Sequence, residues 1–339
     1  MSIASVHKVV IFHDETKRVS NQNLKGHVLF FIPEKLVVNT STPLFGTAVH
    51  EYSPIETFLE KIFGCRDEFH CTGKLHFSDI SGKLWRSIDT AYRRMIDITV
   101  DALRSKSQQV FPYSLNCKVA AIFYPKKADW NIYSGGSHKE QKLRHDETLL
   151  RILLKGAAHY LYDENNLIEV SKIITDGAPE HRPLDEDRIV WRINSDGIRG
   201  KVPLRDYVSF APNASIEHLS SNHGQYHADT EEYKYSNMLQ IADLLLGSIM
   251  RACYVGNKAS KPIPHIGDAC VKKDVIAQPI KEMIEKRKRG SGFKYSGHFK
   301  SFVITQTVFN KGGVSFSEVQ SIDLQERNSR QISINFEAE

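Results

Sequence analysis

Short apolar runs and longer segments of helical spacing alternate along most of this chain of 339 residues. The short runs are rich in β-branched and aromatic residues and end at turn-forming residues, which is typical of buried strands. We expect strands at residues 8–13, 27–32, 44–50, 118–124 and 170–175, and strand-like runs at 188–193, 301–309 and 331–336. In the longer segments apolar residues recur every three or four positions. This spacing predicts helices at residues 54–63, 83–105, 144–162, 237–253 and 274–289.

The order of these elements predicts an α/β fold with one mixed sheet flanked by helices. The first three strands follow one another with no helix between them, so we expect them to be antiparallel. Helical crossovers after residue 118 should make the later strand pairs parallel. The polar region 177–237 is expected to be an insertion or a set of long loops. Prolines after Gly256 indicate a boundary there, which gives a main domain at 1–256 and a C-terminal extension at 257–339.

Composition places the chain among ordinary globular proteins, with 41% hydrophobic and 25% charged residues. It has no apolar run of about 18 residues, and its start does not resemble a signal peptide, so we expect a cytoplasmic protein without a membrane partner. The cysteines number five and never form a CxxC pair, which favours reduced thiols. Cys65, His70, Cys71 and His76 crowd together, but their spacing fits no common zinc site, so buried thiols are the favoured interpretation.

The net charge of +5 is concentrated near the C-terminus. The stretch 281–300 holds seven Lys or Arg and two Glu, which alone gives +5. Its basic run, Lys286, Arg287, Lys288 and Arg289, can contact phosphates as a substrate-binding patch, because clustered cations gain from counterion release on a polyanion. Aromatic residues follow the run and can stack on bases. A solvated helix end followed by a Gly/Ser loop explains the same residues without a nucleic acid.

Two aspartates stand at the ends of predicted buried strands. Asp14 continues the face of Val10 and Phe12, and Asp176 closes the strand 170–175 before Gly177. Ligands gather at strand ends of this kind in open α/β sheets. The alternative for each aspartate is a turn or a helix cap.

A third aspartate, Asp243, lies in the strongly apolar helix predicted at 237–253. Gln240, Asp243, Gly247 and Arg251 are its only breaks and form a narrow polar stripe. Gly247 leaves room for a close backbone approach. An ionised carboxylate beside a core is unfavourable unless a cation or hydrogen bonds hold it. The three carboxylates therefore suggest one shared site for a divalent cation such as Mg²⁺.

Four segments resemble the DUF3800 proteins, whose fold belongs to the ribonuclease H-like superfamily. They are FHDET at 12–16, LHFSDI at 75–80, IITDG at 173–177 and LQIADLLLG at 239–247, and together they span roughly residues 8–253. The Gln-x-Ala-Asp element is the most distinctive. Thr16 and Lys17 replace the Ser-Gly that the family favours, and Lys74 stands where an acidic residue often precedes the histidine.

The resemblance implies a ribonuclease H-like sheet and a nuclease that uses two Mg²⁺ or Mn²⁺ ions. In that superfamily carboxylates from the first strand, a middle strand and a late helix surround both ions, which stabilise the attacking and leaving oxygens. Asp14, Asp176 and Asp243 occupy those positions here. Glu15 either supports Asp14 or caps the strand end. His76 is a candidate for moving a proton or contacting phosphate, and Asp79 for an outer carboxylate; a structural role at a turn is the alternative for both.

The resulting hypothesis is a metal-dependent nuclease that acts on DNA or RNA. The resemblance also implies a setting in phage defence or mobile-element biology, and a partner protein or a second copy of the chain is expected to join it. Two alternatives stay open: a nucleic-acid or protein-binding subunit with a degenerate site, and a strand-transfer enzyme that uses the same residues.

Overall fold

The computed structural model of this chain describes residues 5–16, 24–42, 46–81, 84–103, 115–125, 137–162, 166–177, 189, 207–255, 269–288, 301–310, 313–318 and 331–333. The predicted strand at 188–193 therefore lies almost wholly outside the described residues. So does most of the basic stretch, and at Lys286, Arg287 and Lys288 only the backbone of the last helix is described.

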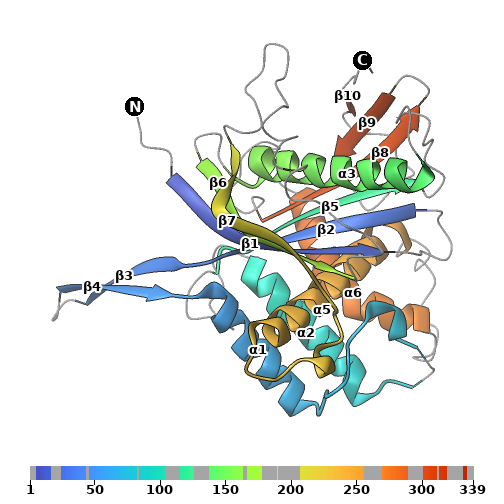
Figure 1. The fold of residues 1–339 in the computed structure, drawn as a ribbon. Helices are drawn as coiled ribbons and strands as arrows, with labels where there is room; N and C mark the ends of the chain where they lie inside the picture. Colours follow the sequence, from blue (N-terminus) through green and yellow to red (C-terminus); the bar gives the residue numbers. More distant parts are fainter. Residues whose placement is uncertain are drawn as a thin grey trace.

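One sheet of eight strands forms the centre of the fold, in the order β10-β9-β8-β5-β2-β1-β6-β7 (Figure 1). The strands are β1 (Ser5–Thr16), β2 (Leu24–Pro33), β5 (Lys118–Pro125), β6 (Asn166–Asp176), β7 (Val208–Leu219), β8 (Phe302–Asn310), β9 (Gly313–Glu318) and β10 (Gln331–Ser333). A separate antiparallel pair, β3 (Leu36–Thr42) and β4 (Gly46–Tyr52), extends from the sheet to one side.

The predicted mixed sheet is confirmed. β1 pairs antiparallel with β2, and β2 pairs antiparallel with β5. On the other side of β1, β6 and then β7 run parallel to it. The prediction for residues 44–50 was wrong in one respect, because that segment forms β4 of the small hairpin and the third antiparallel strand of the main sheet is β5. The polar residues 39–42 at the end of β3, followed by Pro43, suit a hairpin that leaves the sheet equally well.

Helices cover both faces of the sheet (Figure 1). One face carries α1 (Pro54–Glu68), α2 (Ser87–Leu103), α5 (Glu231–Met250) with a π-helical end at Arg251–Val255, and α6 (Ala269–Lys288). The other face carries α3 (His138–Tyr160). Each predicted helix is present. Ser53 caps α1 by accepting from the backbone N–H of Glu56, with Pro54 at the first helical position as the sequence indicated.

The alternation of β1 assigns its residues to the two layers. Val10 and Phe12 pack in the core beneath α5, whereas Val9 and Ile11 pack in the core beneath α3. Successive side chains of a strand point to opposite faces. Asp14 therefore faces the α5 layer, and Glu15 faces the α3 layer.

The region predicted as an insertion, 177–237, supplies part of the sheet itself. β7 pairs parallel with β6 from Ile168 with Val208 to Asp176 with Leu219, with a break in register after Val170 and Phe210. The residues after 256, predicted as an extension, add α6 to the helix layer and β8 to the sheet beside β5. A buried ion pair, Lys272 to Asp89 at 2.7 Å, joins α6 to α2. Within the described residues, no helix combines the length and apolar character needed to cross a membrane.

Candidate active site

Asp14 and Asp176 lie on the same face of two neighbouring parallel strands. Phe12 pairs with Ile174 and His13 with Thr175, so one further step in the same register brings Asp14 beside Asp176. Phe12 and Ile174 both belong to the core beneath α5. Asp14 is buried and Asp176 is partly exposed. The alternation in the sequence thus correctly placed Asp14 on the face of Phe12 and Asp176 on the face of Ile174.

A β-bulge in β6 sets this alignment. Val9 pairs with Val170 but Val10 pairs with Lys172, so Ser171 is an extra residue opposite β1. Its hydroxyl donates to the carbonyl of Val9 at 2.9 Å. Val170 packs toward α3, whereas Ile174 packs toward α5, although the two are an even number of residues apart.

Asp243 reaches the same end of the sheet from α5. The Lys172 ammonium lies over the ring of Tyr235, 5.3 Å from its centroid. From Tyr235 to Asp243 the helix advances about 12 Å, and from Lys172 to Asp176 the strand advances about 13 Å. Burial raises the pKa of Asp243, and the charge of Asp176 acts in the same direction, against the effects of His76, the Phe77 N–H and Lys74.

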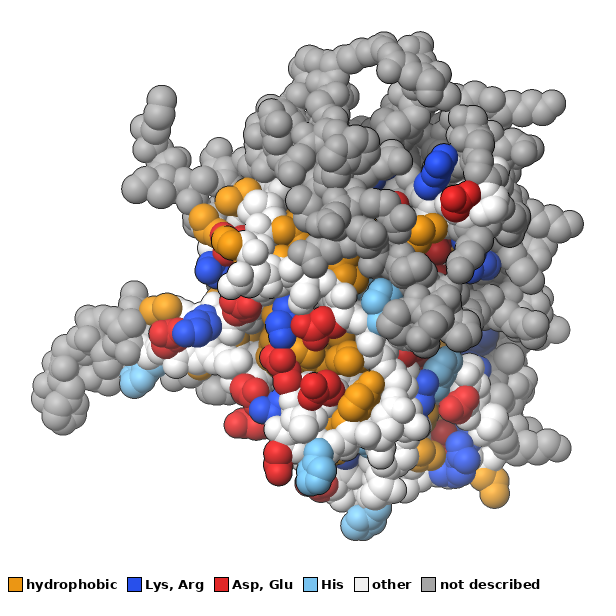
Figure 2. All heavy atoms as spheres, in the orientation of Figure 1, with side chains coloured by type: hydrophobic (Ala, Val, Ile, Leu, Met, Phe, Trp, Pro, Cys, Tyr) orange, Lys and Arg blue, Asp and Glu red, His pale blue; other side chains and the backbone are white. Residues whose placement is uncertain are grey.

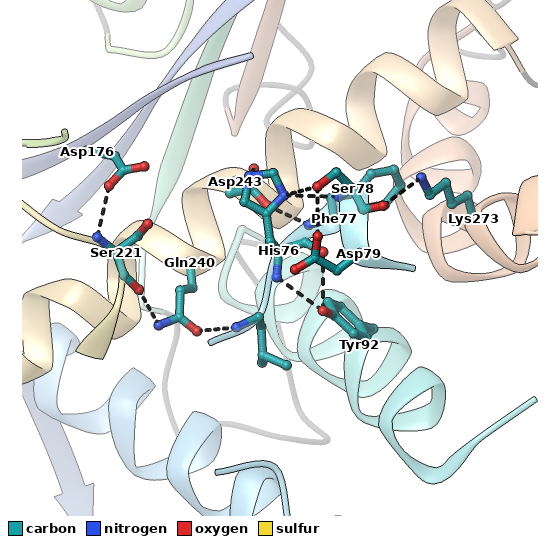
Figure 3. A network of polar contacts seen from close by, with 11 residues as sticks. His76, Phe77, Ser78, Asp79, Tyr92, Asp176, Ser221, Gln240, Asp243 and Lys273 are labelled. Carbon is teal, nitrogen blue, oxygen red and sulfur yellow. Dashed lines mark hydrogen bonds and ion pairs between the residues drawn. The ribbon is translucent and has the colours of Figure 1, made fainter. Parts of the chain in front are cut away.

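Backbone N–H groups hold two of the three carboxylates. Asp243 Oδ2 accepts from the N–H of Phe77 at 2.7 Å, and Asp176 Oδ1 accepts from the N–H of Ser221 at 2.9 Å. Phe77 begins a short 3-10 helix (Phe77–Asp79), and Ser221 lies in the segment that follows β7 (Figure 3). Each of these hydrogen bonds fixes the direction of its carboxylate.

Gln240 ties these two segments together. Its Oε1 accepts from the N–H of Leu75 at 2.8 Å and from Arg66, and its Nε2 donates to the carbonyl of Ser221 at 2.7 Å. Nε2 also contacts His223 Nδ1 at 2.9 Å. The prediction that Gln240 binds substrate was wrong, because its side chain is fully buried with partners at both ends. It positions the backbone that holds Asp176 and Asp243 (Figure 3).

His76 lies beside Asp243, as its prediction as a site residue required. Its Nε2 is 3.4 Å from Asp243 Oδ1. Its Nδ1 accepts from the N–H of Ser78 at 3.1 Å, so the ring proton of the neutral imidazole is on Nε2 and points to the carboxylate. Asp79 is exposed and accepts from the Ser78 hydroxyl at 3.0 Å. It ends the short 3-10 helix Phe77–Asp79, whose N-cap is His76.

Gly247 confirms the expectation of a close approach at the polar stripe. A Cβ built there would lie 2.3 Å from Cγ and 2.7 Å from Cβ of Phe77. The missing side chain lets Phe77 pack directly on α5, one turn after Asp243. The N–H of this same Phe77 donates to Asp243, so the glycine sets the distance of that hydrogen bond.

Gly247→Ala is expected to lower the free energy of unfolding by about 1–3 kcal/mol, because overpacking forces Phe77 and its backbone away from α5. The matched control is Gly156→Ala in α3, where a Cβ meets nothing within 4 Å. That change should stabilise the helix by about 0.5–1 kcal/mol. Urea unfolding of both variants measures the difference. Equal stability of the two variants would contradict the packing argument.

Glu15 was expected near Asp14 or as a cap, and it does not join the aspartate site. It pairs with His27 across β1 and β2 and faces α3, where its donor atom lies within 4.8 Å of those of His27 and Asp146. Among the residues that the structure describes, this is the only group of three potential ligands so close together. At least one pair of donor atoms among Asp14, Asp176 and Asp243 is therefore more than 4.8 Å apart.

Two cations near the site were not anticipated. Lys74 is close enough for its charge to lower the pKa of Asp243. Lys273 of α6 lies over the ring of Phe77, 5.7 Å from its centroid, and contacts the carbonyl of Ser78. Lys74 directly precedes LHFSDI in the sequence, so its position near the site could have been predicted. Lys273 comes from a distant helix, and no local pattern marks it.

The four cysteines whose side chains the structure describes are ordinary buried thiols. Cys65, Cys71, Cys117 and Cys253 are free and buried. Burial raises the pKa of Cys65 to about 12, so it is a poor thiolate ligand. Arg251, the last member of the polar stripe, forms a two-point ion pair with Asp274.

Acidic side chains gather over α1 and the start of α5, with single lysines among them (Figure 2). A hollow there is lined by Ser53, Ile55, Glu56, Asp229, Glu231, Lys234 and Tyr235. It lies about two turns of α5 away from Asp243. Its carboxylates repel phosphate, so the hollow is a poor approach for a polyanion. The end of the sheet beside Lys74 and Lys273 has the more favourable charge.

Comparison with known proteins gives no assignment: no protein-family model, curated protein or solved structure matches this chain.

Proposed function

We propose that this protein is a divalent-metal-dependent nuclease of ribonuclease H-like architecture. The observation that carries the proposal is the convergence of Asp14, Asp176 and Asp243. They come from a first strand, a middle strand and a late helix: Asp14 and Asp176 end β1 and β6 in register, and the charge of Asp176 acts on Asp243. Ligands of open α/β folds bind at such strand ends.

The order of the central strands supports the architecture. Three antiparallel strands, β5, β2 and β1, are followed by the parallel strands β6 and β7. This is the mixed sheet that the resemblance to DUF3800 proteins implies. The hairpin β3–β4 forms a separate sheet, and β8 extends the main sheet beyond β5.

The residues fit hard cations such as Mg²⁺ or Mn²⁺, which take carboxylate oxygens and water. Asp176 raises the pKa of Asp243, so the charged pair repels and a cation between them would relieve the repulsion. Bound ions would activate water and stabilise the oxygens of the cleaved phosphodiester. Asp14 and Asp176 would hold them from the sheet and Asp243 from the helix.

His76 would act on protons at the edge of this site. With 38% of its side chain exposed, its imidazole can exchange a proton with solvent, and its Nε2–H points to Asp243. It therefore orients that carboxylate and can donate to a departing oxygen. Lys74 and Lys273 would attract the phosphate backbone of DNA or RNA to the same end of the sheet.

A binding subunit with a degenerate site is the second candidate. The spacing of the three carboxylates favours it, because their donor atoms do not all lie within 4.8 Å of one another. It would bind nucleic acid without metal and with a steep dependence on salt.

The test is cleavage of single- and double-stranded DNA and RNA with Mn²⁺, Mg²⁺ or a chelator. We expect cleavage only with metal, and a loss of about 100-fold or more in Asp14→Asn, the size typical of removing one electrostatic catalytic group. The matched control is Asp67→Asn, an exposed aspartate of α1, which should cleave as the wild type does. Equal cleavage by both variants would remove Asp14 from the mechanism. Binding without any cleavage would favour the second candidate, and joined product strands would indicate strand transfer.

A further inference from the structure

A second cluster of potential ligands lies on the opposite face of the sheet from Asp14. Glu15 of β1 and His27 of β2 are direct cross-strand partners, and Asp146 comes from α3 above them. One donor atom from each lies within 4.8 Å of the others. Ligands held about 2.1 Å from one ion are roughly 3–4 Å apart, so this group needs little adjustment to share an ion.

Asp146 supplies an independent sign of a missing ligand. The residue is 8% exposed, and among described residues no hydrogen-bond donor reaches its buried Oδ1. The nearest polar nitrogen of the cluster is His27 Nε2, at 3.9 Å. A buried carboxylate oxygen without a hydrogen bond is unfavourable and calls for a cation.

His27 is suited to be a ligand rather than the missing cation. Burial lowers the pKa of His27 well below its ordinary value, and the neighbouring His13 and His145 act in the same direction. A neutral imidazole offers one nitrogen lone pair. Tyr124 contacts the same Nε2 at 3.2 Å, so its hydroxyl can donate there until a metal replaces it.

A chain of hydrogen bonds can fix the orientation and tautomer of His27. Its Nδ1 lies 2.9 Å from His13 Nε2, and His13 Nδ1 lies 2.8 Å from the hydroxyl of Thr175. If each imidazole carries its proton on Nδ1, the chain runs to Thr175 and leaves His27 Nε2 open toward Asp146. Metal-bound histidines have such a partner on the second nitrogen.

We propose that Glu15, His27 and Asp146 bind one divalent transition-metal ion of the Zn²⁺ class, at a site separate from Asp14, Asp176 and Asp243. One imidazole and two carboxylates suit Zn²⁺, whereas Mg²⁺ prefers oxygen ligands alone. The ion would connect β1, β2 and α3 at the strand end that also carries Asp14.

The test uses full-length protein with Asp14→Asn and Asp243→Asn, so that failure of the nuclease proposal does not affect the result. After dialysis against Zn²⁺ with excess Mg²⁺, elemental analysis should find one Zn²⁺ per chain. Asp146→Asn and His27→Gln should each weaken binding by at least about tenfold. The matched control is Glu147→Gln, the next buried carboxylate of α3, which lies outside the ligand group and should keep its Zn²⁺.

X-ray absorption of the Zn²⁺-loaded parent protein gives a readout that needs no further substitution. We expect scattering from one imidazole and from carboxylate oxygens, with no sulfur. Failure to retain Zn²⁺, a spectrum without imidazole, or unchanged binding in the folded Asp146→Asn variant would each overturn the proposal. Circular dichroism shows which variants are folded.

Discussion

Gln240→Leu is expected to lower the free energy of unfolding by about 3–5 kcal/mol. The change leaves the N–H of Leu75, the carbonyl of Ser221 and the Arg66 guanidinium without their buried partner. Each unsatisfied buried group costs about 1–3 kcal/mol, and more when it is charged. Urea unfolding measures the loss. Metal-dependent cleavage should fall as well, because the same two segments hold Asp176 and Asp243.

Gln240→Glu separates the two ends of this side chain. Glutamate keeps an oxygen for Leu75 and Arg66 but has no N–H for the Ser221 carbonyl. The lost hydrogen bond should therefore disturb mainly the segment at Ser221, which holds Asp176. Gln225→Leu, at an exposed glutamine near the same loop, controls for the change of residue type. If Gln240→Leu were as stable as that control, Gln240 would not be the connection between the segments.

Lys272→Met is expected to destabilise the fold by about 3–5 kcal/mol, because it leaves Asp89 as a buried carboxylate without its ammonium partner. Both side chains are fully buried, and Lys272 also donates to the carbonyl of Ser81. Chemical denaturation measures the loss. The neighbouring variant Lys273→Met, at a partly exposed lysine, should change stability by less than about 1 kcal/mol.

The effect of Lys272→Met should depend on pH. Burial opposes ionisation of Asp89, but the bonds from Lys272 and Arg86 outweigh it and lower the pKa. A lowered carboxyl pKa contributes stability above the unfolded value of about 3.9, and this stability is lost as the pH falls through the lower folded value. The gap between wild type and variant should therefore narrow in acid. A gap independent of pH would show that Asp89 is not the ionised partner.

Local sequence patterns were sufficient for most of the central fold. The alternation in β1 and the end of β6 placed Asp14 and Asp176 on one face, and the helical pattern around Asp243 placed it toward the core. The same alternation put Glu15 on the opposite face. The sequence therefore already indicated that Glu15 lies away from Asp14, although the resemblance led us to consider the two residues together.

Long-range packing decided what the sequence did not reveal. Gln240 was predicted to bind substrate from a narrow polar stripe, because its partners at Leu75 and Ser221 are distant in the chain. The strand at 44–50 carries an apolar pattern that suits a hairpin as well as the central sheet. The ligand group at His27 and Asp146 joins a strand to a helix more than 100 residues later, and neither residue belongs to a recognisable motif.

The extra residue at Ser171 has a consequence for how this chain can change in length. If Val170 kept its place beneath α3 and the strand continued without the bulge, every later side chain would reverse its side and Asp176 would turn toward α3. Asp176 lies on the same face as Asp14 only because Ser171 is left out of the alternation of side chains along β6. An insertion or deletion between Val170 and Asp176 must therefore preserve parity: two residues at a time, or one residue together with the gain or loss of a bulge.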